Sequence, residues 1–232
     1  MIERFSIAAP AAQLASRFEV EEPQSFHARY NAAPSQLLPV ITSSGSGGFS
    51  FFYWGQPPGL SKNKTLAEKI INVRAELIAE KPVLLRNLKL NRCLVPSDGF
   101  YSWKKVGKKT LIPWRFSLES NEIFSMPAFW EEYEDTDGNT IHTFAILTTI
   151  ATQPVAAVTD RMPVIFERKE EKIWLSQNST EDELKSLLQI SRSVTLNGYP
   201  VSPQLNNLAI DRPSLILPTP AADQFGNLTL FE

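Results

Sequence analysis

The stretch HTFAILTTIATQPVAAVTDRMPVIF, residues 142–166, decides the fold. Its first part has the alternating apolar pattern of a β-strand, because successive side chains of a strand point to opposite faces of a sheet. Polar and small residues around a proline follow and indicate a turn. A second apolar segment then runs to Phe166. The stretch therefore predicts two β-strands joined by a polar turn.

Turn signals elsewhere divide the chain into further short strands. Seventeen prolines and ten glycines are spread along the sequence, which is typical of many short elements rather than long helices. The aromatic run FSFFYW, residues 49–54, predicts one more strand. Polar turns between apolar runs predict hairpins at residues 43–48, 104–109, 119–121 and 135–139, the last with a favoured Asp-Gly turn.

Helical signals are fewer than strand signals. The sequence STEDE at residues 179–183 is a capping box that precedes Leu184, Leu187 and Leu188, and it predicts a helix. Residues 64–77 have only roughly helical spacing, and residues 72–76 within them are equally compatible with a loop. No internal repeat and no linker between two domains is evident. We therefore expect one α+β domain dominated by antiparallel strands.

The composition is typical of a soluble globular protein. Of 232 residues, 43% are hydrophobic and 21% are charged. No run of 18 apolar residues predicts a membrane span, and the N-terminus lacks the basic leader and long apolar run of a signal peptide. Cys93 is the one cysteine, so an internal disulfide is excluded and a reducing compartment is indicated. We expect a cytoplasmic protein.

The charge pattern allows a local nucleic-acid site but not a basic coat. A net charge of −2 argues against binding nucleic acid over the whole surface. The densest basic cluster lies at residues 104–109, and the densest acidic cluster lies at residues 131–137. The basic cluster is compatible with a phosphate-binding groove or with a solvated hairpin edge. A solvated edge is the preferred interpretation of the acidic cluster.

Common catalytic and cofactor motifs are missing from the sequence. There is no phosphate loop, dinucleotide fingerprint or Gly-x-Ser-x-Gly elbow, so we expect no cofactor. His27 and His142 are the two histidines, and neither is near Cys93 in the sequence. Transition-metal sites generally use several such ligands, so we expect no metal. We interpret His142 as a structural residue on a strand.

Two further sequence blocks accompany the stretch 142–166: NVRAE at residues 72–76 and RCLVPSDGFYSW at residues 92–103. Together the three blocks resemble the SRAP family, the SOS-response-associated peptidases that process abasic sites in single-stranded DNA. The resemblance implies a single SRAP-like domain over residues 1–232, dominated by a curved, barrel-like antiparallel sheet with flanking helices. We expect a monomer whose tail, from about residue 219, is loosely attached.

The resemblance also implies a particular covalent chemistry. SRAP proteins use an N-terminal cysteine, exposed when the initiator methionine is removed. Its amine and thiol capture the ring-opened aldehyde of an abasic site as a thiazolidine cross-link. An α-amine has a pKa of about 8, so a useful fraction is unprotonated at neutral pH, and a neighbouring thiolate closes the ring. An asparagine, a glutamate and a histidine complete the family pocket.

This chain matches the four catalytic positions of the family at one residue, Asn72. Ile2 stands in place of the cysteine, Ser102 in place of the glutamate and Thr159 in place of the histidine. Ile2 has no nucleophilic atom, and hydroxyl groups do not titrate near neutral pH. Cys93 lies in an apolar strand and is better interpreted as a buried structural thiol. We therefore expect the cross-linking and peptidase chemistry to be lost or altered.

Binding of DNA could remain without that chemistry. Single-stranded nucleic acid is held by a positive groove and by aromatic faces on which bases stack. By resemblance, Arg74 contacts the DNA backbone and Trp54 wedges against bases, although the sequence equally allows Trp54 to pack in the core. We interpret Asp160 and Arg161 as an internal ion pair at the pocket floor. The candidate DNA-contacting residues are Arg4, Trp54, Arg74, Arg86, Thr149 and Arg161.

Three functional hypotheses remain open from the sequence. In the first, the protein binds single-stranded DNA at abasic sites in the response to DNA damage. In the second, the remnant pocket holds a small ligand or another partner, and DNA is not involved. In the third, the amine of Met1 forms a Schiff base with the abasic-site aldehyde and supports lyase-like strand cleavage without a thiol.

Overall fold

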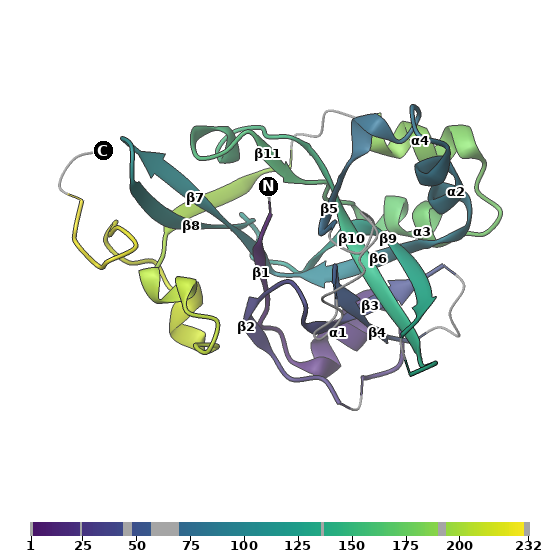
Figure 1. Ribbon diagram of the computed structural model, residues 1–232, viewed down its shortest axis with the longest axis horizontal. Helices are drawn as coiled ribbons and strands as arrows, with labels where there is room; N and C mark the ends of the chain where they lie inside the picture. Colours follow the sequence, from purple (N-terminus) through teal and green to yellow (C-terminus); the bar gives the residue numbers. More distant parts are fainter. Residues whose placement is uncertain are drawn as a thin grey trace.

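The computed structural model describes residues 2–23, 25–43, 48–56, 70–135, 137–189 and 194–229. Two β-sheets form the body of the molecule, and four α-helices flank them in the described part of the chain. Figure 1 shows one sheet extending to the left of β1 and the other sheet to its right, next to the helices. The expected α+β fold is confirmed.

The first sheet has five strands in the order β12-β8-β7-β1-β2, and all its neighbours are antiparallel. Strand β1 is buried over its last three residues and β7 over its first four, and Phe5, Ile7 and Phe100 pack in the core shared with the second sheet. The strands are β1 (Arg4–Ile7), β2 (Arg29–Ala32), β7 (Gly99–Val106), β8 (Thr110–Leu118) and β12 (Leu196–Pro200).

The second sheet closes on itself. Its strands follow the order β11-β10-β4-β3-β6-β9, and β9 also pairs with β10, so that β10, β4, β3, β6 and β9 form a ring. Most pairs are antiparallel, but β10 runs parallel to β4 and to β5. The barrel-like sheet is therefore confirmed. The strands are β3 (Leu37–Thr42), β4 (Ser50–Trp54), β5 (Asn72–Arg74), β6 (Arg92–Ser97), β9 (Phe124–Glu134), β10 (Thr140–Ile150) and β11 (Arg161–Pro163).

Most helices lie on one side of the barrel. Figure 1 shows α2, α3 and α4 together at the right, whereas α1 lies below β1. None of the helices described here is long and apolar enough to cross a bilayer. The α-helices are α1 (Ala11–Phe18), α2 (Pro82–Leu90), α3 (Arg168–Leu175) and α4 (Glu181–Gln189). The short 3-10 helices are η2 (Ala75–Leu77), η3 (Val155–Ala157), η4 (Pro203–Asn206) and η5 (Pro213–Ile216).

The main core lies between the two sheets. Phe5 of β1 meets Trp54 of β4 edge to face, with ring centroids 5.0 Å apart. Phe100 and Phe116, partners on β7 and β8, stack at 5.3 Å. Aromatic pairs in these arrangements add about 0.5–1.5 kcal/mol each to the stabilisation from burial alone. Ile2 belongs to the same core, so the described N-terminal end of the chain is anchored inside the molecule.

Several local predictions from the sequence are confirmed. Strands β9 and β10 pair across residues 135–139, and β7 and β8 pair across the lysine turn. Helix α4 begins with the expected capping box, in which Thr180 and Glu183 exchange hydrogen bonds. Strands β3 and β4 pair on both sides of the turn predicted at residues 43–48, of which residues 44–47 lie outside the described residues.

Two local predictions are wrong. Residues 119–121 do not close a hairpin, because β8 pairs in the first sheet and β9 in the second. A turn does form at these residues, but it connects the first sheet to the second instead of closing a hairpin. Residues 72–76 are neither helix nor plain loop. Residues 72–74 form β5 beside β10, and η2 follows directly. Residues 64–69 of the predicted helix lie outside the described residues.

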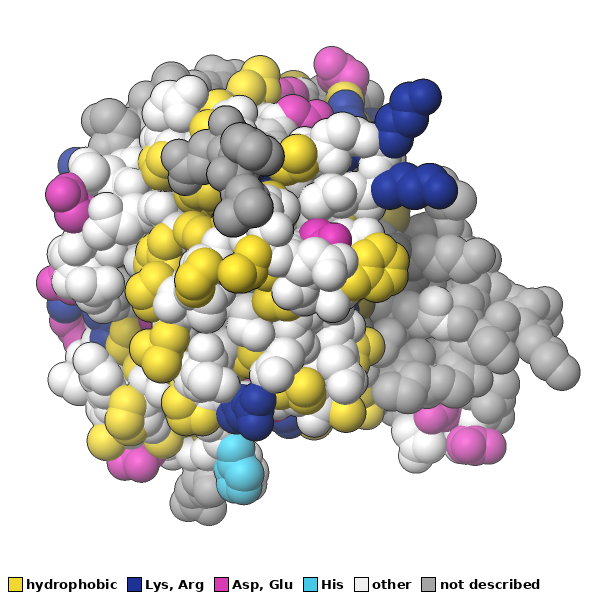
Figure 2. All heavy atoms as spheres, turned by 90° about the vertical axis from the view of Figure 1, so that its left-hand side faces the viewer, with side chains coloured by type: hydrophobic (Ala, Val, Ile, Leu, Met, Phe, Trp, Pro, Cys, Tyr) yellow, Lys and Arg dark blue, Asp and Glu magenta, His cyan; other side chains and the backbone are white. Residues whose placement is uncertain are grey.

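The C-terminal segment runs along the first sheet. Thr219 donates its N–H to the carbonyl of Pro200, and the Gln224 side chain bonds to the backbone of Leu111 and Lys109. Figure 2 shows hydrophobic side chains gathered over the centre of this side of the molecule. Exposed apolar side chains of the segment include Leu208, Leu217, Phe225 and Leu228.

Candidate functional site

Strand β1 brings the N-terminal residues to the junction of the two sheets (Figure 1). The side-chain amide of Asn72 on β5 donates a hydrogen bond of 2.7 Å to the carbonyl of Ile2. Two of the four family positions are therefore in direct contact. The oxygen of the Asn72 side-chain amide is shielded from solvent and has no hydrogen-bond partner among the described residues. The Ile2 side chain is 0% exposed and packs in the core.

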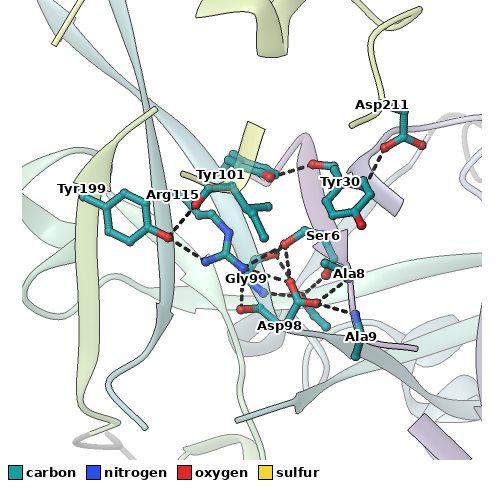
Figure 3. A network of polar contacts seen from close by, with 12 residues as sticks. Ser6, Ala8, Ala9, Tyr30, Asp98, Gly99, Tyr101, Arg115, Tyr199 and Asp211 are labelled. Carbon is teal, nitrogen blue, oxygen red and sulfur yellow. Dashed lines mark hydrogen bonds and ion pairs between the residues drawn. The ribbon is translucent and has the colours of Figure 1, made fainter. Parts of the chain in front are cut away.

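A buried polar network fixes the position of β1 (Figure 3). Asp98, between β6 and β7, accepts hydrogen bonds from the Ser6 hydroxyl and from the backbone N–H groups of Ala8 and Ala9. Arg115 of β8 donates to Asp98 at 2.9 Å, and its other terminal nitrogen donates to the hydroxyl of Tyr199. Because both charged groups are largely buried, this pair is screened far less than a surface ion pair. The Asp98–Arg115 pair thereby holds β1 in its register beside β7.

Gly99 gives the network the room it needs. A Cβ atom at this position would lie 2.5 Å from the Cζ atom of Arg115. We expect Gly99→Ala to move Arg115 away from Asp98 and to lower the free energy of unfolding by about 1–3 kcal/mol, as overpacking typically does. Urea unfolding measures the loss. Gly48→Ala is the matched control, since a Cβ atom there meets nothing within 4 Å. Equal stability of the two variants would contradict this role of Gly99.

Ser102 lies on β7 directly opposite Trp114 on β8. Its side chain faces the inter-sheet core, the residue is 2% exposed, and its hydroxyl has no hydrogen-bond partner within the described ranges. A buried hydroxyl without a partner is uncommon, because it loses its hydrogen bonds to water without replacing them. The structure thus places an unused polar atom where the family has a carboxylate.

Thr159 lies between η3 and β11 and is half-buried. Its backbone N–H donates to the carbonyl of Val155 at 3.0 Å, and its hydroxyl approaches a carboxylate oxygen of Asp160 at 3.5 Å. The backbone contact to η3 fixes the residue in place. What this position offers is a hydroxyl group rather than the imidazole of the family.

Arg161 is bound in place by a different partner from the one expected. It is 7% exposed and donates hydrogen bonds of 3.0 and 2.9 Å to the Glu76 carboxylate. It also donates to the carbonyl of Thr148 at 2.6 Å. The expected ion pair with Asp160 is wrong: the partner is Glu76, which follows β5. Arg161 therefore links η2, β10 and β11, and two of its nitrogens are occupied within the protein.

The Glu76–Arg161 pair lowers the pKa of the Glu76 carboxyl group. Partial burial by itself raises the pKa of Glu76, but hydrogen bonds and attraction from Arg161 outweigh it and hold that pKa below its usual value. The pair therefore favours the ionised carboxylate. A lowered pKa means that this contribution to stability is present above the unfolded-state pKa and is lost as the pH falls through the folded-state value.

Trp54 lies in the core rather than on the surface. The residue is 0% exposed, and its indole N–H donates to the carbonyl of Ile71 at 2.8 Å. Of the two alternatives that the sequence leaves open, the structure therefore selects core packing. Base stacking on Trp54 is not available in this conformation, because Phe5 and Phe144 cover the ring.

The other candidate contacts differ in exposure. Arg74 and Arg86 are exposed, and among the residues described neither forms an ion pair. Arg4 is half-buried, donates to the carbonyl of Glu3 at 2.9 Å, and has a shielded Nε atom without a partner. Thr149 lies in a cavity of about 540 Å³ that is lined by side chains of η2, β10, β11 and α4. The structure thus offers Arg74 and Arg86 as free cations on its surface.

Nothing in the described residues forms a cluster of metal-ligating side chains. Cys93 is fully buried on β6, and burial raises the pKa of its thiol well above its usual range. The interpretation as a buried structural thiol is therefore confirmed. His142 lies 2.9 Å from a carboxylate oxygen of Glu132 and stacks on Phe52, as expected for a structural histidine.

The arrangement of the two sheets matches solved structures. A crystal structure of a protein from Bacteroides thetaiotaomicron superimposes with a TM-score of 0.80 at 25% identity, covering 93% of this chain and 99% of that one. The profile of the SOS response associated peptidase (SRAP) family matches residues 1–208. This chain belongs to the SRAP family.

Curated relatives of the chain carry names that describe one activity. The abasic site processing protein YoqW of Bacillus subtilis is 34% identical over 221 residues, covering 93% of this chain and 99% of the relative. YoaM of the same organism is 34% identical over 212 residues, covering 89% of this chain and 93% of the relative. The abasic site processing protein YedK of Escherichia coli is 25% identical over 194 residues, covering 82% and 84%.

Sequence reasoning missed three residues that shape the site. Asp98 and Glu76 were not singled out, and Trp114 was not named at all. Trp114 was within reach, because counting back along both strands from the lysine turn pairs Ser102 with Trp114. The contacts of Asp98 with β1 and of Glu76 with Arg161 join residues more than 80 positions apart. Local sequence patterns therefore could not predict them.

Proposed function

We propose that this protein binds single-stranded DNA at abasic sites without forming the thiazolidine cross-link of its family. The observation that carries the proposal is the state of residue 2. Asn72 holds the backbone carbonyl of residue 2 by a 2.7 Å hydrogen bond. The side chain of residue 2 is that of an isoleucine, and it is 0% exposed. The contact between Asn72 and residue 2 supports binding of the abasic sugar here, whereas isoleucine lacks the thiol that would close the thiazolidine ring.

The remaining groups support binding better than catalysis. Asn72, Ser102 and Thr159 supply an amide and two hydroxyls, which donate and accept hydrogen bonds but do not carry protons to and from a reacting centre at neutral pH. The shielded amide oxygen of Asn72 and the Ser102 hydroxyl have no partner in the described part of the protein. Both are ready to bond the hydroxyl groups of a sugar that has lost its base.

Exposed arginines supply the attraction for the DNA backbone. Arg74 immediately follows Asn72 and Val73 on β5 and is exposed, and Arg86 is exposed on α2. Contacts of arginine with phosphate release counterions, so binding through them weakens as salt rises. The abasic site processing names of the relatives agree with this substrate class. The protein would act as a monomer in the cytoplasm.

The covalent part of the proposal is tested on denaturing gels. Single-stranded DNA with one abasic site is incubated with the protein, with and without borohydride. We expect no cross-link in the absence of borohydride, and a cross-link that survives without it would refute the loss of thiazolidine chemistry. Capture that depends on borohydride would reveal an imine to an amine, as expected if Met1 forms a Schiff base.

The binding part is tested by fluorescence anisotropy at several salt concentrations. We expect tighter binding to the abasic strand than to an intact strand of the same sequence, with affinity that falls steeply as salt increases. Arg74→Gln is expected to weaken both complexes and to reduce the salt slope by about one. Absence of measurable binding to either strand would exclude DNA and leave the small-ligand hypothesis.

A further inference from the structure

We propose that Trp114, Lys104 and Ser102 form a second subsite on the β7–β8 hairpin, which holds an intact nucleotide of the single strand beside the abasic sugar. This inference rests on the proposed function, because it assigns a surface to the same DNA. It differs from the family positions, since neither Trp114 nor Lys104 is among them. We call these three residues the hairpin subsite.

The register of the hairpin places the three side chains on one face. Ser102 lies opposite Trp114, and Lys104 lies opposite Ile112, in an antiparallel ladder. Directly opposed residues project to the same side, and so do residues two apart on one strand. Further toward the core, Phe116 stacks with Trp114 at 6.4 Å. The face is thus continuous from the buried core, through the indole, to the half-buried Lys104.

The hairpin subsite contains hydrogen-bonding groups that the protein leaves unused. The indole N–H of Trp114 and the hydroxyl of Ser102 are both shielded and have no partner in the described part of the chain. A buried donor without a partner is destabilising, and an incoming acceptor would restore the lost hydrogen bond. By contrast, Trp103 on the same strand donates its N–H to Asn206 at 2.9 Å. The unused groups of Trp114 and Ser102 therefore lie on one face of the hairpin, and Trp103 lies on the other.

Charge on the hairpin suits an anionic strand. The Lys104 ammonium lies 5.5 Å from the centroid of the Trp114 ring. The end of the hairpin adds three exposed lysines, and in the described part of the chain none of the four forms an ion pair with a carboxylate. They are Lys105, Lys108 and Lys109. An aromatic ring with a cation above it is the combination by which proteins hold single strands without sequence preference.

The position of the subsite defines what it binds. Ser102 belongs both to the family pocket and to the hairpin subsite, so a strand whose abasic sugar sits by Asn72 would place a neighbouring nucleotide at Trp114. The base would stack against the indole, and its phosphate would draw Lys104 from the ring. Since every base has an aromatic face, we expect little dependence on its identity.

The test measures binding of labelled oligothymidine, intact or with one abasic site, by fluorescence anisotropy. We expect Trp114→Leu to weaken both complexes about tenfold or more, because base stacking contributes about 1–3 kcal/mol per base. Trp114→Phe, which retains a ring but lacks the N–H, should lose less. Lys104→Gln should weaken binding and lower the salt slope by about one. Lys105→Gln removes the same charge from the opposite face and should change affinity less than twofold.

The outcomes separate the subsite from the proposed function. If the abasic strand is preferred but Trp114→Leu and Lys104→Gln bind like the natural protein, the hairpin subsite is wrong and the proposed function stands. If Trp114 matters but the abasic strand is not preferred, the subsite stands and the proposed function fails. Binding to neither strand overturns both. Should Trp114→Leu fold poorly, Lys104→Gln decides, because Lys104 is only half-buried and glutamine keeps a polar side chain there.

Discussion

A chain that carries Ile2→Cys, Ser102→Glu and Thr159→His together is expected to cross-link to an abasic site without any reductant, where the natural protein does not. The scaffold for the reaction is in place, because Asn72 already holds the carbonyl of residue 2 at 2.7 Å. A cysteine at position 2 supplies the thiol, and removal of the initiator methionine exposes an amine whose pKa is about 8. The substitutions at 102 and 159 restore groups that can transfer protons.

The size of the gain separates the contributions of the three positions. Ile2→Cys alone should give a slow cross-link, because it provides the nucleophile but no acid or base. General acid–base catalysis contributes about 10²–10⁴-fold, so the triple variant should react faster by a factor of that order. The measurement is the fraction of abasic DNA retained in a heat-stable complex on a denaturing gel over time.

Ile2→Ser in the same triple background is the matched control, since it exposes an amine of similar pKa but offers no thiol to close the ring. It should be trapped only with borohydride. The Ile2 side chain packs in the core, so its replacement costs stability, about 1–3 kcal/mol for a loss of this size. A triple variant that is folded and still inert would show that the substituted positions are not what distinguishes this chain from reactive relatives.

The sequence predicted those parts of the fold that depend on local chemistry. The capping box at Thr180 and the hairpin between β9 and β10 form as expected, because each depends on neighbours within a few residues, although the hairpin connection spans residues 135–139 rather than a two-residue Asp-Gly turn. The turn at residues 119–121 shows the limit of such signals. A polar turn indicates that the chain changes direction. It does not indicate which strands pair, and here β8 and β9 on its two sides join different sheets. Which strands pair depends on partners far away in the sequence.

The candidate site follows the same division. The motif spacing identified Asn72, Ser102 and Thr159, and the structure brings Asn72 onto the backbone of Ile2. The fate of Trp54 could not be derived from its neighbours in sequence, because its burial depends on Phe5 and on the parallel pairing of β4 with β10. The partner of Arg161 was equally out of reach of the sequence. Arg161 pairs with Glu76, which is 85 residues away, and not with the adjacent Asp160.

Arg92→Met is expected to lower the free energy of unfolding by about 3–5 kcal/mol, the range typical when one partner of a buried charged network is removed. Arg92 lies on β6 and is 2% exposed, without a carboxylate beside it. Its guanidinium donates to the carbonyls of Leu88 and Lys89 at 2.6 and 2.7 Å, and to those of Trp174 and Ser176 at 2.6 and 2.7 Å. One side chain thus binds the C-terminal ends of both α2 and α3.

The helix ends explain how a lone buried cation is tolerated. The last carbonyls of a helix have no partner within it and carry a partial negative charge, so a guanidinium there replaces both a hydrogen-bonding partner and a counterion. Burial lowers the pKa of Arg92, but an arginine retains its charge at neutral pH. Methionine replaces only the aliphatic part of the arginine side chain. The four carbonyls lose their donor, at a cost of about 1–3 kcal/mol for each that water cannot reach.

Urea unfolding of Arg92→Met, Arg92→Lys and Arg86→Met distinguishes this role from a general effect of charge. Lysine keeps the charge but presents three donors on one compact group, which cannot span two helices as the planar fork of arginine does. Arg92→Lys should therefore lose most of the same stability. Arg86→Met removes an exposed arginine from α2 and should change stability by less than about 0.5 kcal/mol. If Arg92→Met lost no more than Arg86→Met, the two helices would have to be held to β6 by their apolar contacts around Trp174 alone.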